Sequence, residues 1–112
     1  MDSAMDVDKN PKRVGRLPAV PVFSNAADLI YARTGRAAYA LPENRDPTSL
    51  VANPALSRQV ASLGQVLRLR AGVVVYMDVS RYYVVNLDIL ERQLPLKVID
   101  QTPDGVILRL SS

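Results

Sequence analysis

The run Val73–Met77 constrains the fold of this chain most, because its residues (VVVYM) are apolar or aromatic at every position. Successive side chains of a strand point to opposite faces of the sheet, so this strand needs cover on both faces. The run predicts a strand that is either central in its sheet or covered at an interface with another chain. Val75, in the middle, is expected at the centre of the buried sheet.

Two neighbouring segments also have the character of strands. Leucine alternates with arginine over residues 67–70, which predicts a strand that starts after Gly64. The run 82–87 (YYVVNL) is rich in strand-forming residues and follows Met77 closely. The dipeptide Ser80–Arg81 lacks the glycine or asparagine of a tight hairpin turn. Either a looser turn begins at Asp78, or the two runs form one long bent strand.

The C-terminal part carries the clearest local signal in the chain. Residues 96–100 and 106–110 are separated by Gln-Thr-Pro-Asp-Gly at 101–105. Proline fixes its own φ angle and glycine adopts positive φ at little cost, so this segment suits a turn. It predicts a β-hairpin.

A first helix is expected over residues 26–33. Ser24 or Asn25 can cap its N-terminus, and Asp28 lies in its first turn, where a carboxylate is favoured by the helix dipole. Gly35 is the expected C-terminal stop, since glycine readily adopts the left-handed conformation that ends many helices.

A second helix is indicated by Asn53 as N-cap and Pro54 as first helical residue. Apolar residues follow at a helical spacing, and Gly64 is the expected end; they are Leu56, Val60 and Leu63. A short helical turn capped by Asp88 is expected over residues 88–94, with Pro95 after it.

These elements predict an α+β fold with two short N-terminal helices, followed by a mainly antiparallel sheet of four or five strands ending in the hairpin. Residues 1–20 combine segregated charges with prolines and lack apolar periodicity, so we expect a disordered or extended arm. Residues 21–112 form a single domain in this interpretation.

The chain has no histidine and no cysteine. This excludes ordinary zinc sites, Ser-His-Asp and Cys-His catalysis, thiol redox chemistry and disulfides. We therefore expect no enzymatic activity, no cofactor and no metal. The apolar stretch 71–77 is too short to span a bilayer, and no apolar segment of signal-peptide type occurs near the start. A soluble intracellular protein, cytoplasmic or nuclear, is expected.

Two pairs of carboxylates are candidates for acid–base chemistry or magnesium binding, namely Glu43 with Asp46 and Asp88 with Glu91. Ordinary structural roles are the preferred explanation, in which Asp88 is a helix cap, Glu91 an exposed helix position and the other two are loop residues. A catalytic role for Tyr82 or Tyr83 with Lys97 lacks any supporting glycine-rich phosphate loop.

Function is predicted in two alternative forms. The preferred one is a non-enzymatic interaction or assembly module, a homodimer or a small subunit of a larger complex, because two short helices cover only one side of a sheet. Its interface residues are expected to be Val73, Val75, Met77, Tyr82, Tyr83 and Val85.

The alternative is nucleic-acid binding, in which arginine neutralises phosphates and tyrosine stacks on unpaired bases. The sheet face for this role consists of Arg68, Arg70, Arg81, Tyr82 and Tyr83, and the arm adds Lys12, Arg13 and Arg16. Arginines beside an apolar strand also prevent edge-to-edge aggregation, which is a competing explanation for them.

Overall fold

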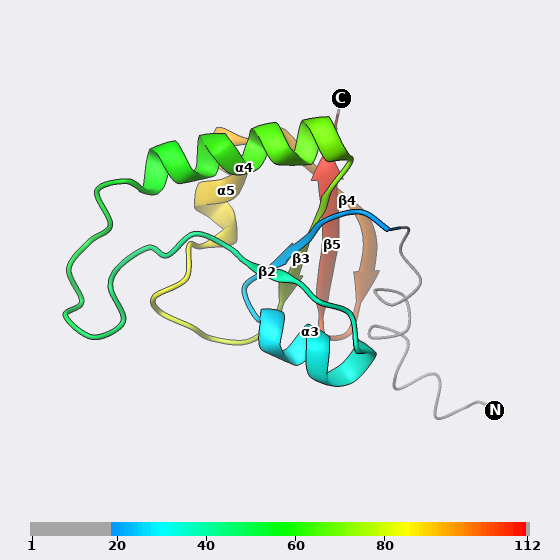
Figure 1. Ribbon diagram of the computed structural model, residues 1–112, viewed down its shortest axis with the longest axis horizontal. Coiled ribbons are helices and arrows are strands. Elements are labelled where there is room, and N and C mark those ends of the chain that lie inside the picture. Colours follow the sequence, from blue (N-terminus) through cyan, green and yellow to red (C-terminus); the bar gives the residue numbers. More distant parts are fainter. Residues whose placement is uncertain (1–18, 112) are drawn as a thin grey trace.

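The computed structural model describes residues 19–111, which form three helices around one five-stranded sheet (Figure 1). The predicted arm, with Lys12, Arg13 and Arg16, lies almost wholly outside the described residues. The elements in chain order are β1 (Val22–Ser24), α3 (Ala27–Thr34), β2 (Tyr39–Ala40), α4 (Leu56–Arg70), β3 (Val73–Met77), α5 (Leu87–Gln93), β4 (Leu96–Thr102) and β5 (Gly105–Leu110).

The sheet is mixed, with strand order β2-β1-β3-β5-β4. Strand β1 runs parallel to both β2 and β3, whereas β5 is antiparallel to β3 and to β4. The expected α+β class is confirmed, but a mainly antiparallel sheet and two helices ahead of all strands were wrong predictions. Strands β1 and β2 are too short to show the alternating pattern of a strand in the sequence. The sequence therefore indicated only helices in this part of the chain, whereas the structure has two strands there as well.

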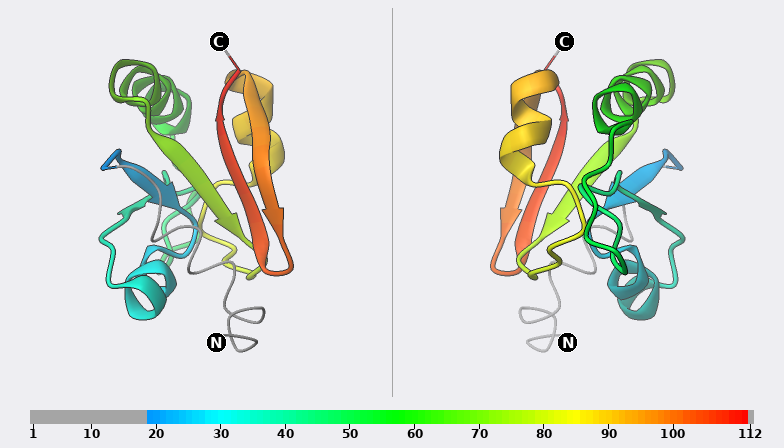
Figure 2. Two further views of the ribbon diagram at one scale, coloured as in Figure 1. Left: turned by 90° about the vertical axis from the view of Figure 1, so that its right-hand side faces the viewer. Right: turned by 90° about the vertical axis from the view of Figure 1, so that its left-hand side faces the viewer.

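Strand β3 is central in the sheet, since it pairs with β1 on one side and β5 on the other. One of its faces, with Val74, packs in a cluster with residues of α4 and α5. The other face, with Val73, Val75 and Met77, packs in a second cluster with Ile30 of α3. Figures 1 and 2 show α4 and α3 toward opposite ends of this strand.

Both faces of the apolar run Val73–Met77 are therefore covered by other parts of the same chain. Val75 has an exposed fraction of 1%, as expected for the centre of the sheet. Val73 and Met77 are buried as well, so the side chains assigned to an interface lie in the chain's own core. Of the two alternatives for this run, the central strand is the one that the structure adopts.

Helix α4 continues through Gly64 to Arg70, so the predicted end at Gly64 and the strand over 67–70 were wrong. A Cβ atom on Gly64 would lie 2.6 Å from Cδ2 of Leu94, just after α5, so this glycine permits close packing. The helix instead ends at Ala71, which adopts the left-handed conformation and donates its N–H to the carbonyl of Leu67. Leu67 is buried and Leu69 is exposed, as expected for a helical repeat.

The start of α4 also differs from the prediction. Asn53 is not the N-cap residue, because the helix begins at Leu56. Asn53 instead accepts a hydrogen bond from the N–H of Ala55 within the turn that leads into the helix.

The segment 82–87 is not a strand. Tyr82 and Tyr83 form a turn, and Val84 makes one isolated antiparallel bridge with Glu43. Helix α5 confirms the short helix predicted after this segment, although Asn86 rather than Asp88 precedes it as N-cap.

The predicted end of the first helix and the C-terminal hairpin are confirmed. Helix α3 ends at Gly35, which has a φ angle of 73° and donates its N–H to Tyr31. Strands β4 and β5 form the hairpin around the Pro-Asp turn, with a register shift between Val98 and Asp100. The prediction that Ser24 or Asn25 caps α3 was wrong, because Ala26 is the N-cap residue and no side chain caps the helix.

Candidate functional site: a groove between helix α4 and the sheet edge

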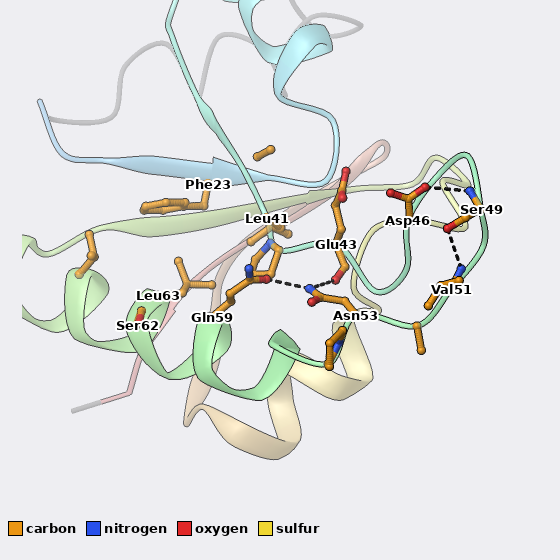
Figure 3. A pocket seen from close by; sticks show the side chains of 15 residues that line it. Phe23, Leu41, Glu43, Asp46, Ser49, Val51, Asn53, Gln59, Ser62 and Leu63 are labelled. Carbon is orange, nitrogen blue, oxygen red and sulfur yellow. Dashed lines mark hydrogen bonds between the residues drawn. The ribbon is translucent and has the colours of Figure 1, made fainter.

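An open groove of about 980 Å³ lies between α4, the strands β1 and β2, and the loop 41–55 (Figure 3). Its volume is in the range of ligand-binding clefts. The side chains that line it come from all three of these parts. They are Phe23, Ala40, Leu41, Pro42, Glu43, Asp46, Ser49, Val51, Ala52, Asn53, Pro54, Gln59, Ser62, Leu63 and Val66.

The groove exists because the sheet extends beyond the part that α4 covers. Val74 of β3 is fully buried on this face, whereas Phe23 on the neighbouring strand β1 is only partly buried. Tyr39 of β2 is paired in register with Phe23, so both rings lie on the same face, with ring centroids 5.3 Å apart. Tyr39 is 63% exposed at the sheet edge. The ring of Phe23, which lines the groove, is thus continued by the exposed ring of Tyr39 at the sheet edge.

The loop that closes one end of the groove is held by Asp46. Oδ1 of Asp46 accepts hydrogen bonds of 2.8 Å from the backbone N–H groups of Thr48 and Ser49. These bonds, first that from Ser49, hold the pKa of Asp46 below its ordinary value. The backbone of Asp46 adds two more bonds, donating to Val51 and accepting from Leu50. Hydrogen bonds within the loop 46–51 therefore fix its shape.

Asn53 connects this loop to α4. Its Nδ2 donates to the carbonyl of Glu43 and to Oε1 of Gln59, each at 2.8 Å. Because Oε1 of Gln59 accepts this bond, the Nε2 group of the same side chain points away from Asn53. Figure 3 shows Gln59 oriented toward Leu41 in the groove. The wall of the groove therefore offers an amide donor above an apolar floor.

The groove is acidic although the whole chain has a net charge of +3. Its lining includes Glu43 and Asp46 and no lysine or arginine. Among residues 19–111, no basic side chain forms an ion pair with either carboxylate. The Glu43 carboxylate and Oδ2 of Asp46 are thus available to a positively charged group that enters the groove, whereas Oδ1 of Asp46 is held by the loop backbone.

The tip of the loop carries exposed apolar side chains. Leu50 is 53% exposed and Val51 64%, and Val51 also lines the groove. Tyr82, which is 61% exposed, lies beside the same loop. Its hydroxyl group donates a hydrogen bond to the carbonyl oxygen of Pro47, with an oxygen–oxygen distance of 3.1 Å. Groove and loop tip form one continuous surface through Val51.

The structure brings together one of the two predicted carboxylate pairs. Glu43 and Asp46 line the same groove, whereas Asp88 and Glu91 lie exposed on α5 and do not line it. Within residues 19–111 there is no group of three or more potential metal-ligating side chains of histidine, cysteine, aspartate or glutamate.

The predicted arginine and tyrosine residues do not share one sheet face. Arg68 and Arg70 lie exposed in the last turn of α4, before the start of β3. Arg81 lies after the end of β3, where it donates hydrogen bonds of 2.7 and 3.2 Å to the two carboxylate oxygens of Asp28. A strand of this length separates the two positions, so these arginines do not form a single basic patch.

The remaining predicted interface residues are divided between surface and core. Tyr82 is exposed and Tyr83 is half-buried, and their rings meet edge to face with centroids 5.5 Å apart. Val85 is fully buried.

The sequence interpretation missed most of the residues that line the groove, above all Phe23 and Gln59. One local signal could have pointed to it, namely the adjacent apolar residues Leu50 and Val51 in an otherwise polar loop.

Comparisons with known proteins do not assign the chain to a family. No protein-family model, curated protein or solved structure matches the chain significantly. Across residues 19–111, no helix has the length and apolar character needed to cross a membrane.

Proposed function

We propose that this chain is a non-enzymatic interaction module that binds an extended segment of a partner protein in the groove between α4 and the sheet edge. The observation that carries the proposal is an open apolar groove lined by two carboxylates, neither of which has an ion-pair partner among residues 19–111. The bound segment is expected to combine apolar side chains with at least one lysine or arginine.

The shape of the groove supports an extended occupant. Helix α4 lines it from Gln59 to Val66. A helix rises about 10 Å over such a stretch. About three residues of extended chain have the same length. Apolar side chains of the segment would cover Phe23 and Leu63, and the Nε2 group of Gln59 would donate to a main-chain carbonyl.

Charge supports a basic residue in that segment. A lysine or arginine between Glu43 and Asp46 would meet two carboxylates without displacing an existing ion pair. An acidic segment would instead be repelled there. Charge at the rim of an interface contributes mainly to specificity and to the association rate, while the apolar floor contributes affinity.

This proposal keeps the class of function that the sequence predicted, an interaction module. It places the binding surface at the groove instead of at strand β3. An assembly of copies through β3 would need this strand to leave the core, since both of its edges and both of its faces are occupied. A partner at the groove needs no such opening. The chain would then act as a small subunit or adaptor within a larger protein complex.

Binding can be tested with the full chain and a display library of random octapeptides. The variant Ser62→Arg places a bulky cation in the groove from an exposed helix position, and Ala61→Arg is its matched control on a neighbouring exposed position outside the lining. Selected peptides should contain apolar residues and a lysine or arginine. Ser62→Arg should weaken their binding at least tenfold, and Ala61→Arg should leave it unchanged.

Two results would overturn the proposal. One is a library that yields no peptide whose binding Ser62→Arg weakens. The other is salt-sensitive binding of single-stranded RNA together with no peptide binding that depends on the groove. In that case RNA binding should be unaffected by Ser62→Arg and lost in the double variant Arg68→Ala with Arg70→Ala. That second result would favour the nucleic-acid alternative.

A further inference from the structure

The loop tip contains a leucine in an unfavourable backbone conformation. Leu50 has a φ angle of 63°, in the left-handed region that glycine and asparagine adopt far more readily. Among the described residues, Ala71 is the other non-glycine residue with positive φ, and it has a structural reason as the C-cap of α4. No helix ends at Leu50.

Folding does not account for a leucine at this position. The conformation is set by the backbone, since the N–H of Leu50 donates to the carbonyl of Asp46, and any residue with an N–H can form this bond. The side chain is 53% exposed and belongs to neither apolar core cluster. An asparagine or glycine would fit the backbone better and would expose less apolar surface.

The location of Leu50, next to a residue that lines the groove, offers a role for its side chain. Its neighbour Val51 lines the groove, so an apolar side chain at position 50 extends the apolar surface of the groove onto the loop tip. The loop beneath it is held by the hydrogen bonds of Asp46 to Thr48 and Ser49. A preformed loop that displays an apolar side chain loses little conformational entropy when a partner covers it.

We infer that Leu50 is an anchor residue for the partner segment and contacts an apolar side chain just outside the groove. This inference rests on the proposed function, because the occupant is the same extended segment. It adds that the leucine serves binding at the expense of local backbone strain. Substitutions at position 50 should therefore change stability and affinity in opposite directions.

Leu50→Asn tests the inference, because asparagine tolerates the left-handed conformation and removes the apolar side chain. The unfolding temperature should stay the same or rise. The affinity for octapeptides selected on the unmodified chain should fall at least fivefold. Leu50→Gly serves as a second variant with the same expectation for affinity. Leu69→Gln is the control, since Leu69 is an exposed leucine of α4 outside the groove lining, and this variant should bind normally.

The outcomes separate the inference from the proposed function. If peptides lose affinity with Ser62→Arg but not with Leu50→Asn, the groove binds the segment and the anchor role of Leu50 is wrong. If both variants at position 50 lower the unfolding temperature, the side chain supports folding and the inference is also wrong. If no selected peptide responds to Ser62→Arg, the proposed function fails and the inference fails with it.

Discussion

The side-chain amide of Asn25 replaces a residue of strand β1 in its pairing with Met77 of β3. Its Oδ1 accepts the N–H of Met77 at 2.7 Å, and its Nδ2 donates to the carbonyl of Met77 at 2.8 Å. The regular parallel pairing of β1 and β3 ends at Ser24 and Val75, one residue before Asn25 and two before Met77. Asn25 is 4% exposed, so these bonds form away from water. They attach the turn before α3 to the central strand.

Asn25→Ala should therefore destabilise the domain. The N–H and carbonyl of Met77 would both lose their bond to Asn25 in a buried position, at a cost of about 2–4 kcal/mol in the free energy of unfolding. Asn25→Asp should also be destabilising, because a carboxylate oxygen would face the carbonyl of Met77. Urea unfolding measures these differences.

Asn86→Ala is the matched control, because Asn86 is exposed and makes no side-chain cap bond to α5. Its free energy of unfolding should stay within about 0.5 kcal/mol of the unmodified chain. Equal stability of Asn25→Ala and Asn86→Ala would contradict the role assigned to Asn25.

Gly105→Ala should be more damaging than an alanine at Gly35. A Cβ atom on Gly105 would lie 2.3 Å from the carbonyl oxygen of Tyr76 and 2.9 Å from Cα of Met77, so backbone would have to move. At Gly35 there is open space, and the cost is only that of a left-handed alanine, about 1–2 kcal/mol. Thermal unfolding of the two variants compares these costs. A smaller loss for Gly105→Ala would show that β3 and β5 are not packed as closely as described.

Stability should decrease on the acid side partly through Asp28. The hydrogen bond from Arg81 is the main reason that the pKa of Asp28 lies below its ordinary value of 3.8. A carboxyl group with a lowered pKa contributes its stabilisation above the unfolded-state value and loses it as pH falls through the folded-state value. The expected window is therefore below about pH 4.

The variant Asp28→Asn should flatten this acid-side decrease, because the residue no longer titrates. Unfolding midpoints measured between neutral pH and pH 3 give the slope, with Glu91→Gln on the exposed face of α5 as control. An unchanged slope in Asp28→Asn would contradict this assignment. Asp46, whose pKa is also lowered, should account for part of the remaining dependence.

Val75→Asp should unfold the domain. Val75 is 1% exposed at the centre of the sheet, and a carboxylate there would be buried without a partner. This costs several kcal/mol against a total stability of about 5–15 kcal/mol for a domain. Val98→Asp on the edge strand β4 is the control, since Val98 is 50% exposed. A wild-type melting temperature for Val75→Asp would be inconsistent with a central β3.

The elements that sequence reasoning predicted correctly are those whose cause is local. Gly35 ends α3 because a single residue must adopt positive φ there, and the turn at Pro103 and Asp104 closes the hairpin through its own backbone preferences. The run Val73–Met77 specified a strand covered on both faces because its residues are apolar or aromatic throughout. Each of these features is indicated by residues that lie close together in the sequence.

Tertiary structure decided the features that depend on distant residues. Helix α4 continues through Gly64, where any side chain would collide with Leu94, and no pattern near position 64 contains that information. The residues 67–70 alternate as a strand would, yet they are helical because Leu67 joins the core cluster that α4 forms with the sheet. The groove depends on how far the sheet extends beyond α4, which places Phe23 opposite Gln59. Sequence alone thus determined the end of α3, the turn of the hairpin and the buried strand β3. Long-range packing decided the strand order, the length of α4 and the groove, because each of these requires contacts between residues far apart in the chain.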